Sequence, residues 1–447
     1  MTPEEWNQSD SFVLDLFFSI NPMDRGFEGL AEVLEVFESL DDELRPDTLC
    51  FRQGDEKYSR QLLRKNLRET YIGDDTVTIM LTRSRPPEIM LRFTGRTDNE
   101  GIHCSVVLQM ESLDFMREPD HAGRRAGHLL SFVRAIASRL PILHGMGHST
   151  TDLYLGTDPH MKDTSVPRPV YEAFWLNVYG PEMVQALGRE RVLTTPAAHV
   201  EELPGGAVLW LTRPTPGDFA SEEARQAQAR ALVHLRPELS LETTLATLRE
   251  RSLAFSPIPF EFDPDVADIL MKEVQFQGLL CMRPTVERFN RYRPPPVSEW
   301  LPASQAPATD VDDVKATLDT YEGRYAEQLI ALLHEKVPVV LGSSLESLPQ
   351  VDYFLWHNKW GRRLPPPEKE LLAQSLGAWL GGHLVNALGG RWVPRRKLEE
   401  SAVIIGDRAW LPFLRARHAM QGQEAPLDFS CTQFFRAALR LAKPQEH

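Results

Sequence analysis

The sequence lacks three patterns that would assign it to a broad class of protein. Its four cysteines (Cys50, Cys104, Cys281 and Cys431) are scattered and form no CxxC pair. This argues against a disulfide framework or a structural zinc site and is typical of a reducing compartment. No apolar run approaches the roughly 20 residues that a membrane-spanning helix needs. The acidic N-terminus also lacks the basic and then apolar pattern of a secretory signal. We therefore expect a cytoplasmic protein.

Motifs of the common enzyme classes are missing as well. The chain contains no GxSxG nucleophile turn, no Walker loop and no GxGxxG fingerprint. VVLGSSLESL (339–348) has the strand, turn and helix character of a phosphate loop but not its lysine. No segment assembles an acid, a base and an oxyanion donor. The sequence thus predicts a protein that is not an enzyme and that holds no cofactor and no metal.

Length and charge limit the domain organisation and the partners. The 447 residues are 42% hydrophobic and 25% charged, and a chain of this length most often forms two or three domains. The net charge of -14 makes nucleic acid an unfavourable partner for the whole molecule. Basic residues gather near the C-terminus, however. A regulatory module that contacts nucleic-acid phosphates through RWVPRRK (391–397) is therefore one alternative.

Apolar periodicity predicts an α+β fold for residues 1–290, with antiparallel sheets covered by helices. Expected strands are 11–20, 76–82, 88–95, 103–110 and 173–180, with a hairpin at 199–213 around Pro204-Gly205-Gly206. Expected helices are 26–44, 57–67, 123–140, 181–188 and 222–235. The order of elements is similar in residues 1–165 and 166–290, which leaves an internal duplication as an alternative, although no sequence repeat accompanies it.

A stretch rich in proline, alanine and serine, residues 291–310, predicts a linker and a domain boundary. Residues 311–447 are expected to form a mainly helical C-terminal domain. In 368–392, leucines recur every four residues beside Gly377, Gly381 and Gly382. Small residues on a helix face allow a second helix to approach closely.

One cluster has the spacing of metal ligands. In LHGMGHSTTD (143–152), His144, His148 and Asp152 are four residues apart, which on a helix would place all three on one side. A metal-dependent enzyme that uses this group is therefore an alternative function. Gly145 and Gly147 disfavour a helix, however, so the favoured interpretation is a glycine-rich turn after helix 123–140.

A second cluster, YFLWHNKWGRR (353–363), concentrates aromatic and basic residues. A half-buried aromatic corner is the favoured interpretation, since tryptophan usually serves as a large core residue. If the cluster is exposed, it is suited to binding a protein partner. The candidate partner-binding residues are then Trp356, Trp360, Arg362 and Arg363.

The segments WLNVYGPEMVQALG (175–188) and ELPGGAVLWLTRPTPGDF (202–219) resemble a bacterial family of formerly unknown function, the type VI immunity proteins. This chain and the family share an aromatic and apolar strand, a Gly-Pro turn, a Leu-Gly helix end, a glycine hairpin and a P-x-x-GD loop. The matching positions are Trp175, Leu176, Gly180, Leu187, Gly188, Gly205, Gly206, Pro214, Pro216, Gly217 and Asp218. The resemblance extends over residues 11–239 and includes LPILHGMGH (140–148). The C-terminal domain resembles only uncharacterised bacterial helical domains.

The resemblance implies an immunity protein, or antitoxin, of bacterial competition by type VI secretion. Such a protein acts by protein–protein interaction: it binds a cognate toxin or effector and blocks it, without catalysis. The acidic composition fits this expectation, because charge complementarity to a basic toxin speeds the encounter.

Overall fold

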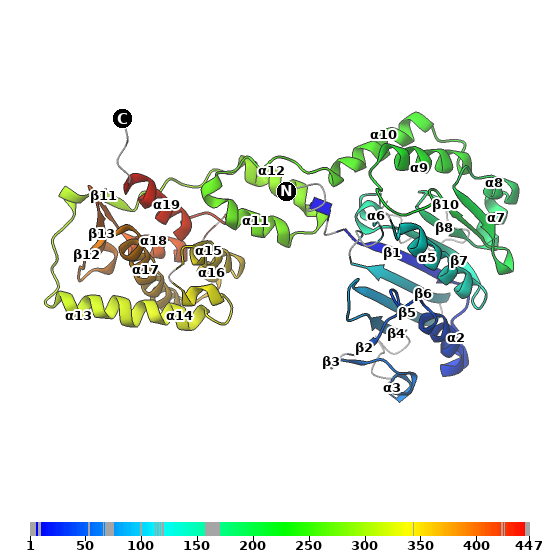
Figure 1. The fold of residues 1–447 in the computed structure, drawn as a ribbon, viewed down its shortest axis with the longest axis horizontal. Helices are drawn as coiled ribbons and strands as arrows, with labels where there is room; N and C mark the ends of the chain where they lie inside the picture. Colours follow the sequence, from blue (N-terminus) through cyan, green and yellow to red (C-terminus); the bar gives the residue numbers. More distant parts are fainter. Residues whose placement is uncertain are drawn as a thin grey trace. The chain divides into compact units, whose positions relative to one another are not determined.

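A computed structural model shows two compact units (Figure 1). The first comprises Met1–Pro257 and Gly278–Arg283, and the second comprises Ile258–Gln277 and Pro284–His447. The structure describes residues 6–7, 10–51, 54–65, 67, 76–98, 101–111, 113, 116, 118, 120–156, 170–342, 344–421, 423 and 425–442.

The division between the units falls earlier than the sequence predicts. Residues 291–310, the expected linker, belong to the second unit. They contain the short strand β11 (Trp300–Pro302), which pairs with β14 (Arg408–Trp410). Glu299, just before β11, is almost fully buried. A proline-rich stretch can supply this strand because β11 is an edge strand and needs ladder hydrogen bonds along only one side.

The first unit contains a ten-stranded antiparallel sheet with helices packed on it. Its strands are β1 (Phe12–Phe18), β2 (Thr48–Phe51), β3 (Gly54–Lys57), β4 (Thr76–Thr82), β5 (Ile89–Asp98), β6 (Gly101–Met110), β7 (Ile142–Ser149), β8 (Leu176–Tyr179), β9 (His199–Glu202) and β10 (Val208–Leu211). Its helices are α2 (Gly26–Glu38), α3 (Arg60–Lys65), α5 (Ala122–Ala137), α6 (Thr150–Gly156), α7 (Pro181–Leu187), α8 (Arg189–Leu193), α9 (Glu222–Leu235) and α10 (Leu241–Ser252). The expected α+β fold is confirmed.

The strand order is β3-β2-β4-β5-β6-β1-β7-β8-β10-β9, so β1 lies in the middle of the sheet. The sheet runs without a break from residues 1–165 into residues 166–290, since β7 pairs with β8. The two stretches are therefore parts of one sheet, not two separate layers. The glycine hairpin forms as expected, with β9 and β10 antiparallel around Pro204–Gly206.

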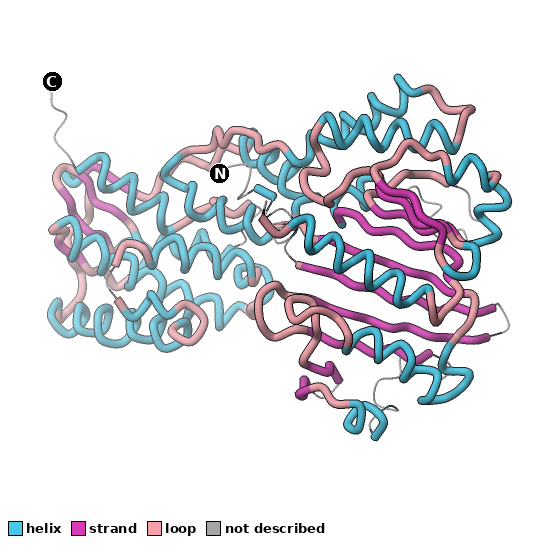
Figure 2. The backbone as a smooth tube through the Cα atoms, turned by 45° about the vertical axis from the view of Figure 1, so that its right-hand side comes forward, coloured by secondary structure: helices cyan, strands magenta, loops and turns pink. Residues whose placement is uncertain are grey.

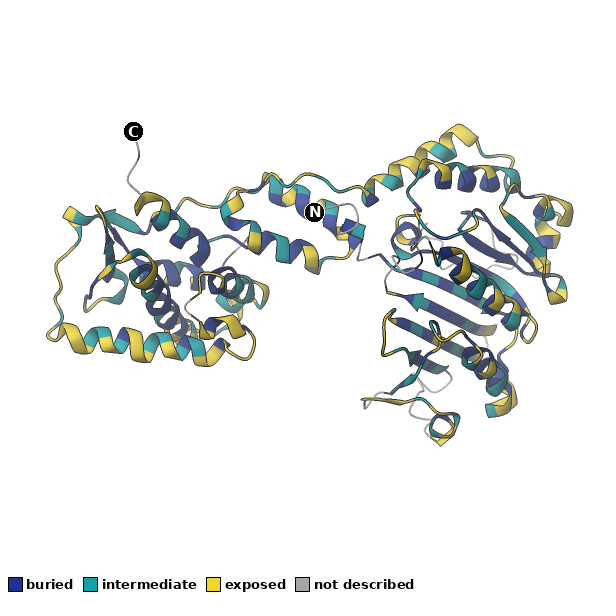
Figure 3. Cartoon of the chain, viewed as in Figure 1, coloured by how far each residue is buried: buried dark blue, intermediate teal, exposed yellow. Residues whose placement is uncertain are grey.

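Alternation along the strands explains which face of the sheet is covered. In β1 every second residue from Phe12 to Phe18 is buried and the residues between are half-buried, and β4 repeats this pattern (Figure 3). The buried set shares one core with the apolar residues of α2 and α5, which lie over the strands in Figure 2. On the opposite face, α7, α8 and α9 cover the β8–β10 end. Burial of the apolar face drives this layering.

The second unit is mainly helical, as expected. Its helices are α11 (Ala267–Phe276), α12 (Leu279–Arg291, of which residues 284–291 belong here), α13 (Val314–Asp319), α14 (Glu327–Leu333), α15 (Ser347–His357), α16 (Trp360–Arg363), α17 (Pro366–Leu388), α18 (Pro412–Gln421) and α19 (Cys431–Ala442). A small sheet accompanies them, in which β12 (Arg391–Val393) and β13 (Ala402–Ile405) join β14 and β11 in the order β11-β14-β13-β12. This small sheet adds to the mainly helical domain that the sequence predicts.

Close packing against α17 follows from its glycines. A Cβ atom added at Gly377 would lie 2.7 Å from the Cα of Phe413 in α18, and one added at Gly381 would overlap the ring of Trp392. The expected close approach of a second helix is therefore confirmed at Gly377, whereas at Gly381 the nearest side chain belongs to strand β12. Gly382 has nothing within 4 Å of its Cβ position, so it takes no part in the contact.

We expect Gly377→Ala to lower the free energy of unfolding of the second unit by about 1–3 kcal/mol, the usual effect of an added methyl group in a filled core. Gly382→Ala is the matched control on the same helix. It should raise stability by up to about 1 kcal/mol, because alanine is the better helix former. Urea unfolding of both variants measures the difference, and equal effects would contradict the close contact at Gly377.

Candidate functional site

His148 and Asp152, two of the three residues with metal-ligand spacing, meet in the interior of the first unit. His148 lies at the end of β7 and Asp152 in the first turn of α6. Nε2 of His148 is 2.6 Å from Oδ2 of Asp152, and both side chains are fully buried. The spacing therefore brings these two residues together, although not on a single helix.

The glycine-rich turn predicted for residues 143–152 is wrong, because most of this segment is strand β7. Its glycines make room for large side chains of the neighbouring strand β1. A Cβ at Gly145 would lie 2.5 Å from Cδ2 of Leu16, and one at Gly147 would lie 3.1 Å from the ring of Phe12. Glycine in a strand often marks such a close approach.

Asp152 is the centre of a buried ionic network. Arg225 of α9 donates two hydrogen bonds to its carboxylate, from Nη1 to Oδ2 at 2.7 Å and from Nη2 to Oδ1 at 2.8 Å. Nη2 of Arg251, from α10, lies 3.3 Å from Oδ2, and its Nη1 lies 2.5 Å from Oε1 of Glu172. Two guanidinium groups thus face two carboxylates, and paired burial of this kind compensates the loss of hydration.

The ionisation of the pair follows from its surroundings. Burial raises the pKa of Asp152, but the hydrogen bond from His148 and the guanidinium groups of Arg225 and Arg251 outweigh this effect and hold the pKa well below its usual range. Burial is the largest effect on His148 and, together with the two arginines, lowers its pKa against the opposing effect of the Asp152 carboxylate. Asp152 is therefore ionised and His148 neutral at neutral pH.

Both ring nitrogens of His148 are in use. The backbone N–H of Trp175 donates a hydrogen bond to Nδ1 at 3.1 Å, so Nδ1 carries no proton. The proton of the neutral ring is then on Nε2, which donates it to Asp152. Neither nitrogen has a lone pair directed at solvent. This arrangement resembles the His–Asp part of a catalytic triad, but the nitrogen that would act as base is already bonded to the backbone.

His144, the third residue of the predicted metal group, does not join this pair. Its ring stacks on Phe17 of β1 with centroids 4.3 Å apart. Asp152 already accepts hydrogen bonds from two guanidinium groups, which would repel a metal ion. His144, His148 and Asp152 are therefore not brought together as a set of metal ligands.

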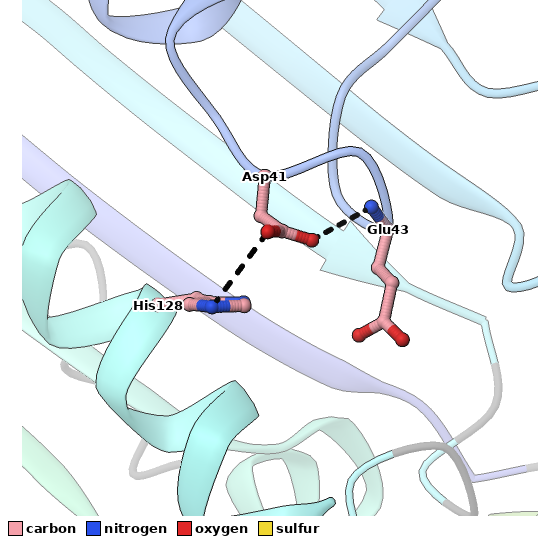
Figure 4. A group of neighbouring side chains, drawn as sticks. All are labelled: Asp41, Glu43 and His128. Atoms are coloured by element: carbon pink, nitrogen blue, oxygen red, sulfur yellow. Dashed lines mark hydrogen bonds and ion pairs between the residues drawn. The ribbon is translucent and has the colours of Figure 1, made fainter.

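Within the described ranges, one other group of three side chains comes within reach of a shared ion: Asp41, Glu43 and His128 (Figure 4). Oδ2 of Asp41 lies 3.8 Å from Nε2 of His128, and Oδ1 accepts the backbone N–H of Glu43. Arg124 and Arg125 contact the Glu43 carboxylate at 2.8 and 3.3 Å. These contacts fasten the loop after α2 to α5. Two adjacent guanidinium groups make the position unfavourable for a cation.

The aromatic cluster of the second unit forms a half-buried corner, as the favoured interpretation has it. Trp356 and Trp360 are half-buried, and the ring of Trp360 packs edge-on against Phe354 with centroids 5.0 Å apart. Arg362 and Arg363, in α16, are exposed. Their use in binding a partner stays a prediction.

The basic stretch 391–397 is engaged with carboxylates of its own unit. Arg395 pairs with Asp310 and Glu400, Arg396 pairs with Asp312, and Lys397 also pairs with Glu400. Neutralised guanidinium groups attract phosphate weakly, so these contacts weigh against the alternative of a nucleic-acid-binding module.

Exposed apolar side chains form a different feature of the second unit. Leu332, Val339, Leu341, Leu345 and Leu371 are exposed by 50%, 41%, 66%, 43% and 40%, respectively. They belong to the end of α14, the 3₁₀ turn Pro338–Leu341, the segment before α15 and the start of α17. We call these five residues the apolar patch.

Comparison with known proteins gives no further guide. No protein-family model matches the chain, and no curated protein matches it either. Among the described residues, none of the helices has the length and apolar character needed to cross a bilayer.

Sequence reasoning missed the partners of Asp152 and the apolar patch. Arg225 and Arg251 lie 73 and 99 residues further along the chain, and neither belongs to a motif with Asp152. In the sequence, the run VVLGSSLESL shows only the character of a phosphate loop without its lysine. The exposure of Val339 and Leu341 beside the buried Val340 depends on the 3₁₀ turn Pro338–Leu341 and its contacts, which no motif of the sequence indicates.

Proposed function

We propose that this chain is a non-catalytic binding protein that neutralises a cognate toxic effector by direct contact, as bacterial immunity proteins do. The resemblance of residues 11–239 to type VI immunity proteins motivates the proposal. The observation that carries it concerns His148. Each of its two ring nitrogens forms a hydrogen bond within the protein, and its side chain is fully buried.

Catalysis and metal binding each need a side chain that a bound molecule or ion can reach. A general base must reach the proton of a substrate within hydrogen-bond distance, directly or through one water. A metal ligand must offer a lone pair to the ion. His148 offers neither to a bound molecule, and Asp152 is engaged by Arg225 and Arg251. The residues that look most like catalytic groups in the sequence thus support a structural role.

The surface of the chain offers groups that suit binding. The net charge of -14 favours a basic partner. Long-range attraction raises the rate of encounter, which matters for a protein that must intercept a toxin before it acts.

Co-expression tests the proposal. The product of the neighbouring gene, expressed alone in a bacterial host, should arrest growth, and co-expression of this chain should restore growth. The two proteins should also co-purify. A product that is harmless alone, or that never co-purifies with this chain, would overturn the proposal.

A titration distinguishes binding from catalysis. With the purified effector and an assay of its toxicity in vitro, inhibition by a stoichiometric binder rises linearly and ends at a fixed molar ratio. Complete inhibition by a small fraction of an equivalent would instead show turnover, and the non-catalytic part of the proposal would be wrong.

A further inference from the structure

The five residues of the apolar patch lie around the point where α14 ends and α17 begins. Ser375 of α17 and Gln328 of α14 lie side by side, with Oγ and Oε1 3.5 Å apart. Tyr321, just before α14, packs on Trp392, just after α17, so the two helices run antiparallel. One turn from the Gln328–Ser375 contact, Leu332 and Leu371 therefore lie at the same level on adjacent helices.

The remaining three members of the patch follow α14 directly. Val337 and Val340 are buried and hold the 3₁₀ turn against the core, whereas Val339 and Leu341 point away from it. Leu345 precedes Leu348, which is buried at the start of α15. The buried residues thus hold residues 337–342 and 344–348 against the core, and the exposed ones point away from it.

The exposed apolar area is large enough for a binding surface. Five leucine-sized side chains exposed by two fifths to two thirds present on the order of 400 Å² of apolar surface, which is the size at which a patch on a monomer is often functional. Isolated exposed leucines need no explanation. Four exposed leucines and an exposed valine within one short loop and the two helices beside it do need one.

The margin of the patch is acidic. Glu335, Glu346, Glu368 and Glu370 are exposed and lie within three residues of a patch member. None of the four forms an ion pair with a described residue. Lys336 and Lys369 are the basic residues within the same distance along the chain. The carboxylates therefore outnumber the ammonium groups at this margin, and a partner with basic flanks complements it.

We propose that the apolar patch docks an amphipathic helix of a partner protein, with leucine-sized residues on its apolar side and lysine or arginine at its margins. A helix is favoured over an extended strand because the patch is built from helices and a turn. It offers no strand edge for backbone pairing, so recognition depends on side chains, as in helix-in-groove binding. The inference goes beyond the proposed function, since it assigns a binding role to the second unit, outside the region that resembles immunity proteins.

A designed peptide tests this inference with the full chain. The probe is a fluorescein-labelled 18-residue helix of leucine and lysine in an amphipathic pattern, and the control probe replaces every lysine by glutamate. We expect fluorescence anisotropy to show saturable binding of the Leu/Lys probe and at least tenfold weaker binding of the Leu/Glu probe. The double variant Leu341→Ser/Leu345→Ser should weaken Leu/Lys binding at least tenfold.

Leu441→Ser is the matched control, since Leu441 is exposed by 43% in the same unit but lies in α19. It should leave binding unchanged. All substituted residues are exposed, so urea unfolding curves should coincide with that of wild type. Equal loss of binding in the control, or equal binding of both probes, would overturn the inference. So would a dimer of wild type that the double variant abolishes, because a second copy would then be the occupant of the patch.

Discussion

Asp152→Asn is expected to lower the free energy of unfolding of the first unit by about 3–5 kcal/mol, the range for removing one partner of a buried ion pair. Arg225 and Arg251 stay charged in the variant, because a guanidinium group does not lose its proton in proteins. The side chain of Arg225 is fully buried, so its charge would have no carboxylate to compensate it. An asparagine has nearly the same shape as aspartate, but its NH2 group replaces one of the two oxygens that accept hydrogen bonds from Arg225, so the variant removes the charge and one of these hydrogen bonds.

The measurement is urea unfolding, with hydrogen exchange of peptides from α9 and β7 to assign the loss to the first unit. Glu222→Gln is the matched control, because it removes an exposed carboxylate that pairs with Arg249. This variant should be indistinguishable from wild type, since exposed pairs contribute little. Equal stabilities of Asp152→Asn and wild type would show that the network is not held by this carboxylate.

The pH dependence has a definite sign. The pKa of Asp152 is lower in the folded state than its ordinary value of about 3.9. The ionised Asp152 therefore makes its full contribution to the free energy of unfolding above about pH 4, and this contribution is lost as the pH falls towards the folded-state pKa. The difference in stability between wild type and Asp152→Asn should accordingly narrow in acid.

Most elements of the first unit could be predicted because their signals are local. The alternation in β1, the helical period of α5 and the turn residues Pro204–Gly206 each determine their own segment. β2, β3, α6 and α8 were not predicted. β7 was predicted as a turn, since Gly145 and Gly147 lower its local strand propensity. It forms a strand because β1 and β8 supply hydrogen bonds on both sides, and tertiary context overrides local preference.

The division into units could not be predicted for a similar reason. Residues 291–310 have the composition of a linker, yet Tyr292 donates a hydrogen bond to Asp428, 136 residues away. Trp300 pairs with Trp410 across the small sheet. Composition records what a segment prefers by itself, whereas a domain boundary depends on contacts that are distant in the sequence.

The candidate site was predicted in part. The four-residue spacing of His148 and Asp152 was visible, but the guanidinium groups that determine their ionisation come from α9 and α10. The exposure of Leu341 was not predictable from its identity, because leucine is most often buried. The ionisation and the exposure of these side chains therefore depended on their neighbours more than on their residue type.

In the second unit, Glu299→Gln is expected to lower the free energy of unfolding by about 3–5 kcal/mol. Glu299 and Arg415 are almost fully buried, with Nη1 of Arg415 3.2 Å from Oε2 of Glu299. Nε and Nη2 of Arg415 donate to the carbonyl oxygen of Ser430, and Nδ1 of His418 lies 2.9 Å from Oε1 of Glu299. The substitution keeps the shape of the side chain and leaves the arginine without its carboxylate.

Hydrogen exchange of peptides from α18, together with urea unfolding, measures this loss, and Glu400→Gln is the control with an exposed pair to Lys397.

Burial raises the pKa of Glu299, but Arg415 and the hydrogen bond from His418 reverse the shift and lower the pKa overall. The contribution of Glu299 is thus complete above its unfolded-state pKa of about 4.3 and is lost as the pH falls below it. A protonated glutamate and a glutamine are both neutral, so the difference in stability between wild type and variant should stay constant above about pH 4.3 and narrow as the pH falls below it. A difference of constant size at every pH would contradict the ionised state of Glu299.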